Sequence, residues 1–216
     1  MYEKTKAVIF DMDGVVFDSE KTWHKADAAA DIKFKTGFDK NVRFHCCGRD
    51  EKSIRAYLRT LNPALDVDAY REYIINFVRT EEALVGAPLK PGFTELIKKL
   101  KARNIPIALA TSSRRERAQK LFEKPGLNKS EIFSAEVYAD DVTVAKPNPE
   151  IFLIAANRIG VEPKDAVVIE DSPNGIAAAY AGGFTPIMVV DLIPPPPEFL
   201  EKGLAVYNSL AEVVIP

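Results

Sequence analysis

Residues 7–20 read AVIFDMDGVVFDSE, and this stretch decides the fold. Four apolar residues, Ala7–Phe10, end at Asp11, and Asp13 follows two positions later. Short apolar runs of this kind are typical of strands buried on both faces of a parallel sheet. Because ligands of such sheets collect beyond the carboxyl ends of the strands, Asp11 and Asp13 are candidate site residues.

The rest of the chain alternates short apolar runs with amphipathic stretches. The predicted strands are Ile105–Ala110, Ala166–Ile169 and Pro186–Val190, and the predicted helices are Gly92–Arg103, Glu150–Ile159 and Asn174–Ala181. This alternation predicts an α/β fold, with a parallel sheet between two layers of helices.

One segment, residues 17–85, has helical periodicity and no strand pattern. Ile54 and Leu58 share one helical face, and so do Tyr70, Ile74 and Val78. We therefore predict an α-helical domain over residues 17–85, inserted into a core formed by residues 1–16 and 86–216.

The composition is ordinary for a soluble globular protein, at 47% apolar and 28% charged residues. The 29 basic and 31 acidic residues give no electrostatic basis for binding nucleic acid or an anionic membrane. No apolar run is long enough to span a bilayer, and residues 1–10 lack the features of a secretory signal. The two cysteines, Cys46 and Cys47, are adjacent, which favours a reducing cytoplasm.

Polar residues also follow the other predicted strands, and the carboxyl ends of parallel strands meet at one edge of a sheet. They are Thr111, Ser112 and Ser113 after the second strand, Glu170, Asp171 and Ser172 after the third, and Lys146 ahead of the helix near Glu150. Each motif alone could be a turn or a helix N-cap. Together they form an acidic site that needs a cation, and carboxylates without histidine or thiolate suit Mg²⁺. Since Mg²⁺ held by few carboxylates shares its shell with water and phosphate, we expect a phosphoryl group there.

These residues can be given separate roles. Asp11 is the candidate nucleophile, which would form an aspartyl-phosphate. Asp13 is crowded by negative charge, so we expect it to be protonated and to serve as general acid and then as base. Lys146 and Mg²⁺ would neutralise charge on the transferring group, while the Thr111 hydroxyl and the Ser112 N–H would bind phosphate oxygens.

Over essentially its full length, the chain resembles the haloacid dehalogenase superfamily of phosphotransferases. The motifs that carry this resemblance are Asp11-Met-Asp13-Gly, Ala110-Thr111-Ser112-Ser113, Lys146-Pro147 with Asn148-Pro149, and Ile169-Glu170-Asp171-Ser172 followed by Asn174-Gly175-Ile176. The helical insert is similar to the cap of the beta-phosphoglucomutase-like subgroup. The resemblance implies a Rossmannoid core. It also implies Mg²⁺ bound by Asp11, the carbonyl oxygen of Asp13 and Asp171, with Glu170 nearby or as a further ligand.

The resemblance also bears on the reaction. Dehalogenases of the superfamily lack the second aspartate, so Asp13 favours phosphate chemistry. The subgroup's mutases have a cap histidine at the position of Trp23, and here His24 is displaced by one residue, about 100° around a helix. We therefore expect a phosphatase acting on a small phosphorylated metabolite such as a sugar phosphate. The alternatives are a beta-phosphoglucomutase-type mutase and a non-enzymatic receiver that merely accepts phosphate.

Substrate recognition is expected to come from the cap and the loops that face it. Arg49, next to Gly48, and Arg114, after the Thr-Ser-Ser motif, are the candidate substrate-binding residues, and a solvated arginine is the alternative for each. Trp23 could stack on a substrate, although filling the cap core is the preferred interpretation. Because a capped enzyme needs no partner to close its site, a monomer is expected.

Overall fold

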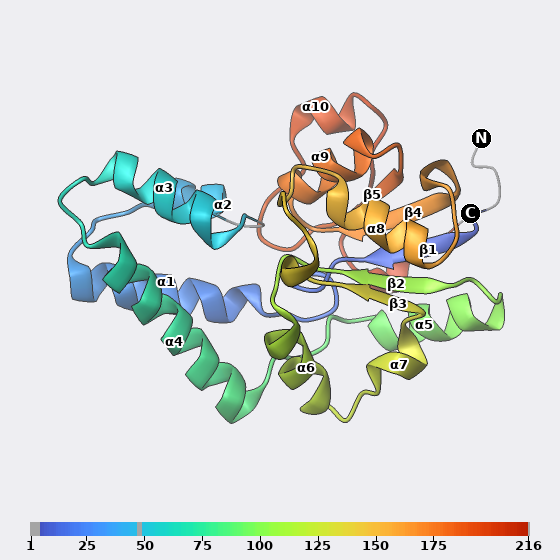
Figure 1. Ribbon diagram of the computed structural model, residues 1–216, viewed down its shortest axis with the longest axis horizontal. Helices are drawn as coiled ribbons and strands as arrows, with labels where there is room; N and C mark the ends of the chain where they lie inside the picture. Colours follow the sequence, from blue (N-terminus) through green and yellow to red (C-terminus); the bar gives the residue numbers. More distant parts are fainter. Residues whose placement is uncertain (1–4, 47–48, 216) are drawn as a thin grey trace.

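The computed structural model describes residues 5–46 and 49–215. Its six strands form one parallel sheet in the order β3-β2-β1-β4-β5-β6 (Figure 1). Their bounds are β1 Ala7–Phe10, β2 Ile107–Ala110, β3 Ala135–Val137, β4 Ala166–Glu170, β5 Thr185–Val189 and β6 Ala205–Tyr207. The predicted α/β fold with a parallel sheet is confirmed. The chain order reverses beside β1, and this is where open sheets of this class bind ligands.

Helices cover both faces of the sheet because successive side chains of a strand point to opposite sides. In β1, Val8 and Phe10 belong to one apolar cluster, whereas Ala7 and Ile9 belong to another. The helices that complete these clusters are α5 (Phe93–Ala102) and α6 (Arg115–Glu123) on the first face, and α8 (Glu150–Arg158) and α9 (Pro173–Ala181) on the second.

A helical unit lies beside the sheet core, with a hydrophobic cluster of its own (Figure 1). It consists of α1 (Glu20–Phe34), α2 (Lys40–Cys46), α3 (Glu51–Leu61) and α4 (Val67–Val85). Its buried side chains include Ile54, Leu58, Tyr70 and Ile74, as the helical periodicity predicts. We call this unit the cap. The two connections between cap and core pair with each other where Phe17 bridges Leu89. The domain boundaries at residues 16/17 and 85/86 stay a prediction.

Two strands, β3 and β6, were not among the predicted strands. Both β3 and β6 are three-residue strands at the edges of the sheet, and neither is fully buried, so neither has the continuous apolar run of a central strand. The second strand begins at Ile107 rather than Ile105, because Pro106 has no N–H to donate to the sheet. The short helices complete the fold: α7 Lys129–Ile132, α10 Pro197–Leu200, and the 3₁₀ turns η1 Ala139–Asp141, η2 Pro163–Asp165 and η3 Leu210–Glu212.

The structure also bears on the cysteines and on the possibility of a membrane span. Cys47 and Gly48 lie outside the described residues, and Cys46 is a half-buried free thiol. None of the helices in residues 5–46 and 49–215 combines the length and apolarity needed to cross a membrane.

Candidate active site

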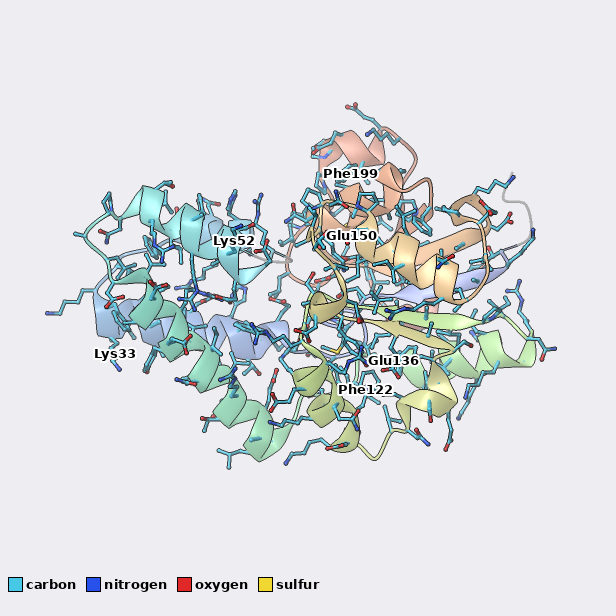
Figure 2. All side chains as sticks on the ribbon, in the orientation of Figure 1. Lys33, Lys52, Phe122, Glu136, Glu150 and Phe199 are labelled. Atoms are coloured by element: carbon cyan, nitrogen blue, oxygen red, sulfur yellow. The ribbon has the colours of Figure 1, made fainter. Side chains whose placement is uncertain are left out.

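A cleft of about 1250 Å³ lies between the carboxyl ends of the central strands and the cap. Every candidate site residue from the sequence lines it: Asp11, Asp13, Arg49, Thr111, Ser112, Arg114, Lys146, Glu170 and Asp171. Both parts of the chain line the cleft with long polar side chains. In Figure 2, Lys52, which lines the cleft, is labelled at the end of α3 nearest the core. The expected meeting of distant motifs at one sheet edge is therefore present.

Lys146 lies at the floor of the cleft between two carboxylates. Its Nζ is 2.5 Å from Oδ1 of Asp11 and 2.8 Å from Oε1 of Glu170, and its side chain is only 2% exposed. Burial alone would lower the pKa of Lys146, but the negative charges of Asp11 and Glu170 outweigh it and raise the pKa. Burial raises the pKa of Asp11 to about 7, with Lys146 opposing this rise and Glu170 adding to it.

Glu170 is the last residue of β4, and both of its oxygens are engaged. Oε1 accepts the bond from Lys146, while Oε2 accepts from the N–H groups of Asp171 (2.9 Å) and Ser172 (2.8 Å) and from the Ser172 hydroxyl (2.9 Å). Gly175 makes room for this carboxylate, because a Cβ at that position would overlap it. The local bonds thus use both oxygens of Glu170, and whether it lies near the metal or binds it as a further ligand stays a prediction.

Asp171 is a carboxylate at the cleft that lies among other negative charges. Burial raises the pKa of Asp171 well above 3.8, and the charges of Glu170 and Asp11 add to this rise. Its carboxylate lies against Gly14, whose φ of +76° and lack of a Cβ let the first loop pass this close. Within residues 5–46 and 49–215 no three Asp, Glu, His or Cys side chains are grouped as metal ligands. Asp11 and Asp171 nevertheless provide carboxylate oxygens at the cleft, and such donors fit Mg²⁺, which needs only one or two protein carboxylates.

Asp13 differs from the expectation that it would be protonated. Its Oδ1 accepts bonds from Ser19 Oγ (2.5 Å) and Arg117 Nη2 (2.7 Å), and its Oδ2 accepts from Ser113 Oγ (2.7 Å) and Arg117 Nη1 (2.7 Å). Burial would raise the pKa of Asp13, but the Arg117 charge and these hydrogen bonds outweigh it, so the pKa is lowered. The prediction was wrong for this arrangement, because no sequence pattern indicates that an arginine from α6 reaches Asp13.

The residues after β2 provide hydroxyl and N–H groups at the cleft. Thr111 is buried, and its Oγ1 accepts the Ser113 N–H at 3.0 Å, which leaves the hydroxyl proton free to be donated. Ser112 lines the cleft. Arg114 is exposed at the rim, where α6 begins, so its side chain can reach a ligand without losing a buried partner.

The cap supplies the opposite wall. Trp23 packs against the cap's hydrophobic cluster and also lines the cleft. It therefore helps to fill the cap core and is also placed where it could contact a substrate. The neighbouring His24 lines the cleft as well, and its buried Nε2 has no hydrogen-bond partner among the described residues. The same holds for Nε of Arg49. His45 instead packs within the cap, with its ring centroid 3.8 Å from that of Tyr57.

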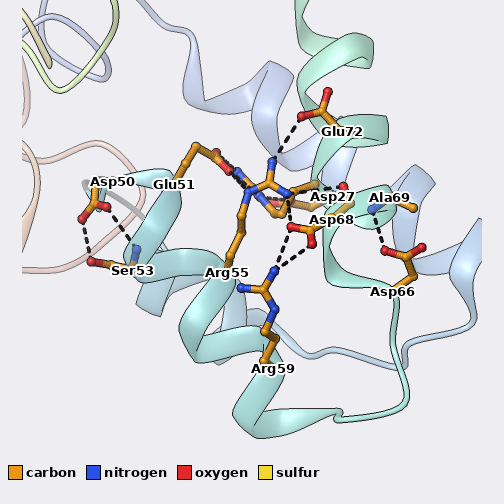
Figure 3. A network of polar contacts seen from close by, with 11 residues as sticks. Asp27, Asp50, Glu51, Ser53, Arg55, Arg59, Asp66, Asp68, Ala69 and Glu72 are labelled. Atoms are coloured by element: carbon orange, nitrogen blue, oxygen red, sulfur yellow. Dashed lines mark hydrogen bonds and ion pairs between the residues drawn. The ribbon is translucent and has the colours of Figure 1, made fainter. Parts of the chain in front are cut away.

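Ion pairs fix the cap helices to one another around this wall (Figure 3). Arg55 of α3 reaches Asp68 (2.7 Å) and Glu72 (3.3 Å) of α4. Closer to the cleft, the buried Arg71 is 2.6 Å from Glu51 and 3.9 Å from Asp27. Asp27 is a largely buried carboxylate, and burial raises its pKa to about 6 despite the opposing charges of Arg71 and Arg43.

Asp27→Asn is expected to stabilise the protein at neutral pH. Because the pKa of Asp27 is raised on folding, the folded state binds more protons than the unfolded state between about pH 4 and 6, and the free energy of unfolding falls as the pH rises through that range. The variant should lose this dependence and gain roughly 1 to 2 kcal/mol at pH 7. Urea unfolding across this pH range measures it. Asp39→Asn, which changes an exposed carboxylate, is the control, and equal gains in both variants would contradict the assignment to burial.

A family model described as a haloacid dehalogenase-like hydrolase matches residues 5–183. The chain belongs to the haloacid dehalogenase-like hydrolase family. The resemblance seen in the sequence motifs is thereby confirmed.

Relatives of this family match nearly the whole chain. The phosphorylated carbohydrates phosphatase of Thermotoga maritima is 32% identical over 213 residues, covering 97% of this chain and 96% of the relative. The fructose-1-phosphate phosphatase YqaB of Escherichia coli is 34% identical over 190 residues, covering 88% and 98%. Among solved structures, beta-phosphoglucomutase from Clostridium difficile shares the fold, with a TM-score of 0.78, 24% identity, and coverage of 97% of this chain and 93% of that one.

Proposed function

We propose that this haloacid dehalogenase-like hydrolase is a Mg²⁺-dependent phosphatase that acts on a small phosphorylated metabolite, with sugar phosphates as the expected class. The observation that carries the proposal is Asp11, at the floor of a cleft, held at 2.5 Å by the buried Lys146 and followed by Asp13 in the same loop. The full-length similarity to two phosphatases of phosphorylated carbohydrates supports the substrate class.

The residues divide the reaction between them. Lys146 occupies Oδ1 of Asp11, so Oδ2 is the oxygen that attacks phosphorus and forms the aspartyl-phosphate. Asp13 must first leave its Arg117 contact and take up a proton. As the bond from phosphorus to the leaving oxygen breaks, the protonated Asp13 gives that oxygen the proton, and its carboxylate later takes a proton from the water that hydrolyses the aspartyl-phosphate. Thr111 and Ser112 donate hydrogen bonds to the phosphate oxygens.

A divalent cation would be held by Asp11, Asp171 and the carbonyl oxygen of Asp13. When bound, Mg²⁺ neutralises charge on the phosphoryl group. Glu170 has the supporting role of fixing Lys146 and the loop that presents Asp171, as its saturated hydrogen bonds suggest.

Arg49 and Arg114 face the same cleft from the cap and from the core, so they are the residues we assign to the part of the substrate beyond the phosphate. Hydrogen-bonding to sugar hydroxyls or to a second anionic group suits a guanidinium. The proposal keeps the expectation of a cytoplasmic monomer, and the near-neutral net charge supports the absence of a nucleic-acid or membrane surface.

A phosphomutase is the second candidate, and one observation favours it. His24 lines the cleft with a buried Nε2 that lacks a hydrogen-bond partner among the described residues, so a cap histidine is within the site even though its position is shifted. Burial, followed by the charge of Arg43, lowers the pKa of His24, which favours the neutral ring that a general base needs. A receiver function has no such support, because the family is one of hydrolases.

The deciding experiment measures phosphate release with Mg²⁺ from sugar phosphates, nucleotides and phospho-acids, beside glucose-phosphate isomerisation primed with a bisphosphate. The phosphatase proposal expects hydrolysis of at least one sugar phosphate to exceed isomerisation. Isomerisation faster than hydrolysis would replace it with the mutase. Release that persists unchanged in excess EDTA would contradict the role of the metal.

A further inference from the structure

Arg117 is a buried cation to which the reaction as described gives no role. It lies on α6, with its side chain 17% exposed. Its guanidinium binds two carboxylates at once. Nη1 and Nη2 hold the two oxygens of Asp13, each at 2.7 Å, while Nη2 and Nε hold Glu82 at 2.5 and 3.0 Å. Nη1 also reaches Ser113 Oγ at 2.5 Å, so every N–H of the guanidinium has an acceptor.

The three side chains come from three different parts of the fold. Asp13 is in the loop after β1, Arg117 is on a core helix, and Glu82 is near the end of α4, the last cap helix before the chain returns to the core. Glu82 is only 8% exposed, so this is a largely buried contact between cap and core. Any rotation of the cap about its paired connections at Phe17 and Leu89 must move Glu82 relative to Arg117.

The contact also restricts Asp13. A carboxylate has about four acceptor positions, and all four are taken here by Arg117, Ser19 and Ser113. While Arg117 is held in this orientation by Glu82, Asp13 has no oxygen to offer to a leaving group. In the described position of the cap, Asp13 is therefore unable to act as general acid or base.

We propose that Arg117 is a positioning residue that couples the cap to Asp13, an inference that rests on the proposed function. With the cap as described, the Glu82–Arg117–Asp13 contact, here called the latch, holds Asp13 in a resting position. Closure of the cap on a bound phosphate ester separates Glu82 from Arg117, the guanidinium loses its second anchor, and Asp13 becomes free to face the leaving oxygen. Asp13 would thus be released only when substrate has closed the site.

Glu82→Gln tests the latch, because it removes one anchoring charge while keeping the size of the side chain. Glu81→Gln is the matched control. It removes the same charge one residue away on α4, where the side chain does not line the cleft. Trp23 is the only tryptophan in the chain, and its ring centroid is 5.7 Å from Cζ of Arg117, so its fluorescence reports on this contact. The ligand probe is inorganic phosphate, titrated in the presence of Mg²⁺.

If the latch opposes closure, Glu82→Gln lowers the free energy needed to reach the closed state. Its ligand-free Trp23 emission should then be shifted toward the phosphate-bound emission of the wild type, and its affinity for phosphate should rise about fivefold. Glu81→Gln should match the wild type in both measurements. Arg117→Lys keeps the charge but loses the two-sided fork, and it should shift the ligand-free emission in the same direction.

The outcomes separate this inference from the proposed function. Identical ligand-free emission in wild type, Glu82→Gln and Arg117→Lys, all shown to be folded by circular dichroism, would overturn the latch. So would an affinity for phosphate that falls in Glu82→Gln and not in Glu81→Gln. If phosphate fails to bind the wild type with Mg²⁺, the proposed function fails, and the ligand-free emission alone then decides whether Glu82 restrains Trp23 and Arg117.

Discussion

Asp11→Asn is expected to abolish phosphate release, lowering kcat by about 10⁴- to 10⁶-fold, as loss of a nucleophile does in enzymes with covalent intermediates. The amide has the shape of the carboxylate but lacks the negative oxygen that attacks phosphorus. It also removes one charge from the pair with Lys146, whose Nζ lies 2.5 Å from Oδ1. Phosphate release from the best sugar phosphate of the screen, with acid-quenched protein assayed for bound phosphate, measures both the rate and the intermediate.

The control for this variant is Asp165→Asn. Asp165 is paired with Lys6 just before β4, at the opposite end of the strand from the cleft, and it does not line the cleft. That variant should keep wild-type turnover and should accumulate the same acid-stable phosphoprotein. Turnover within tenfold of wild type in Asp11→Asn would exclude Asp11 as the nucleophile.

Lys146→Met is expected to lose both turnover and stability. The methionine fills the space of the lysine stem, but it leaves Asp11 and Glu170 as facing buried carboxylates without a cation. Breaking a buried ion pair from one side costs about 3 to 5 kcal/mol. Urea unfolding in EDTA at pH 7.5 measures this loss. Lys120→Met, which removes an exposed lysine paired with Glu116, should cost less than about 1 kcal/mol.

The pH dependence gives this second prediction a further test. The pKa of Asp11 is raised to about 7 on folding, so the folded state binds more protons than the unfolded state between about pH 4 and 7, and stability falls as the pH rises through that range. Lys146 opposes the rise in this pKa, so its removal should carry the fall to higher pH. The difference in unfolding free energy between wild type and Lys146→Met should therefore widen above about pH 7. A difference that is constant from pH 5 to 8.5 would argue against the assigned charge environment.

The part of the site that could be predicted from the sequence consists of residues that follow a strand directly or lie in a loop at the same end of the sheet. Asp11, Thr111, Lys146 and Asp171 reach the cleft because parallel strands place their carboxyl ends together, and this follows from the order of strands and helices alone. The state of Asp13 could not be foreseen in this way. It depends on Arg117, the last arginine of the run Ser113-Arg-Arg-Glu-Arg117, which turns back toward the first loop one helical turn after the motif. Only the packing of α6 against the core decides which arginine of that run turns inward.

The strands show the same difference between features set by neighbouring residues in the sequence and features set by tertiary packing. β1 matches its predicted bounds because all four of its residues are buried. The edge strands β3 and β6 escape prediction because a three-residue strand that is only partly buried owes its conformation to its neighbour rather than to its own sequence. The local hydrogen bonds of Glu170 could not be foreseen for a related reason. Its partners Ser172 and Gly175 lie within five residues, but their bonds form only once the chain turns from β4 into α9.

The bridge between Phe17 and Leu89 has an evolutionary consequence. Since the chain leaves the core and returns to it at adjacent points, the intervening segment closes on itself and adds little strain to the sheet, whatever its internal length. An insertion of this kind is a module, and it can be exchanged or remodelled while the six strands and the Lys146 ion pairs stay unchanged. Selection can thus alter which molecule is admitted to the cleft separately from what happens to its phosphate.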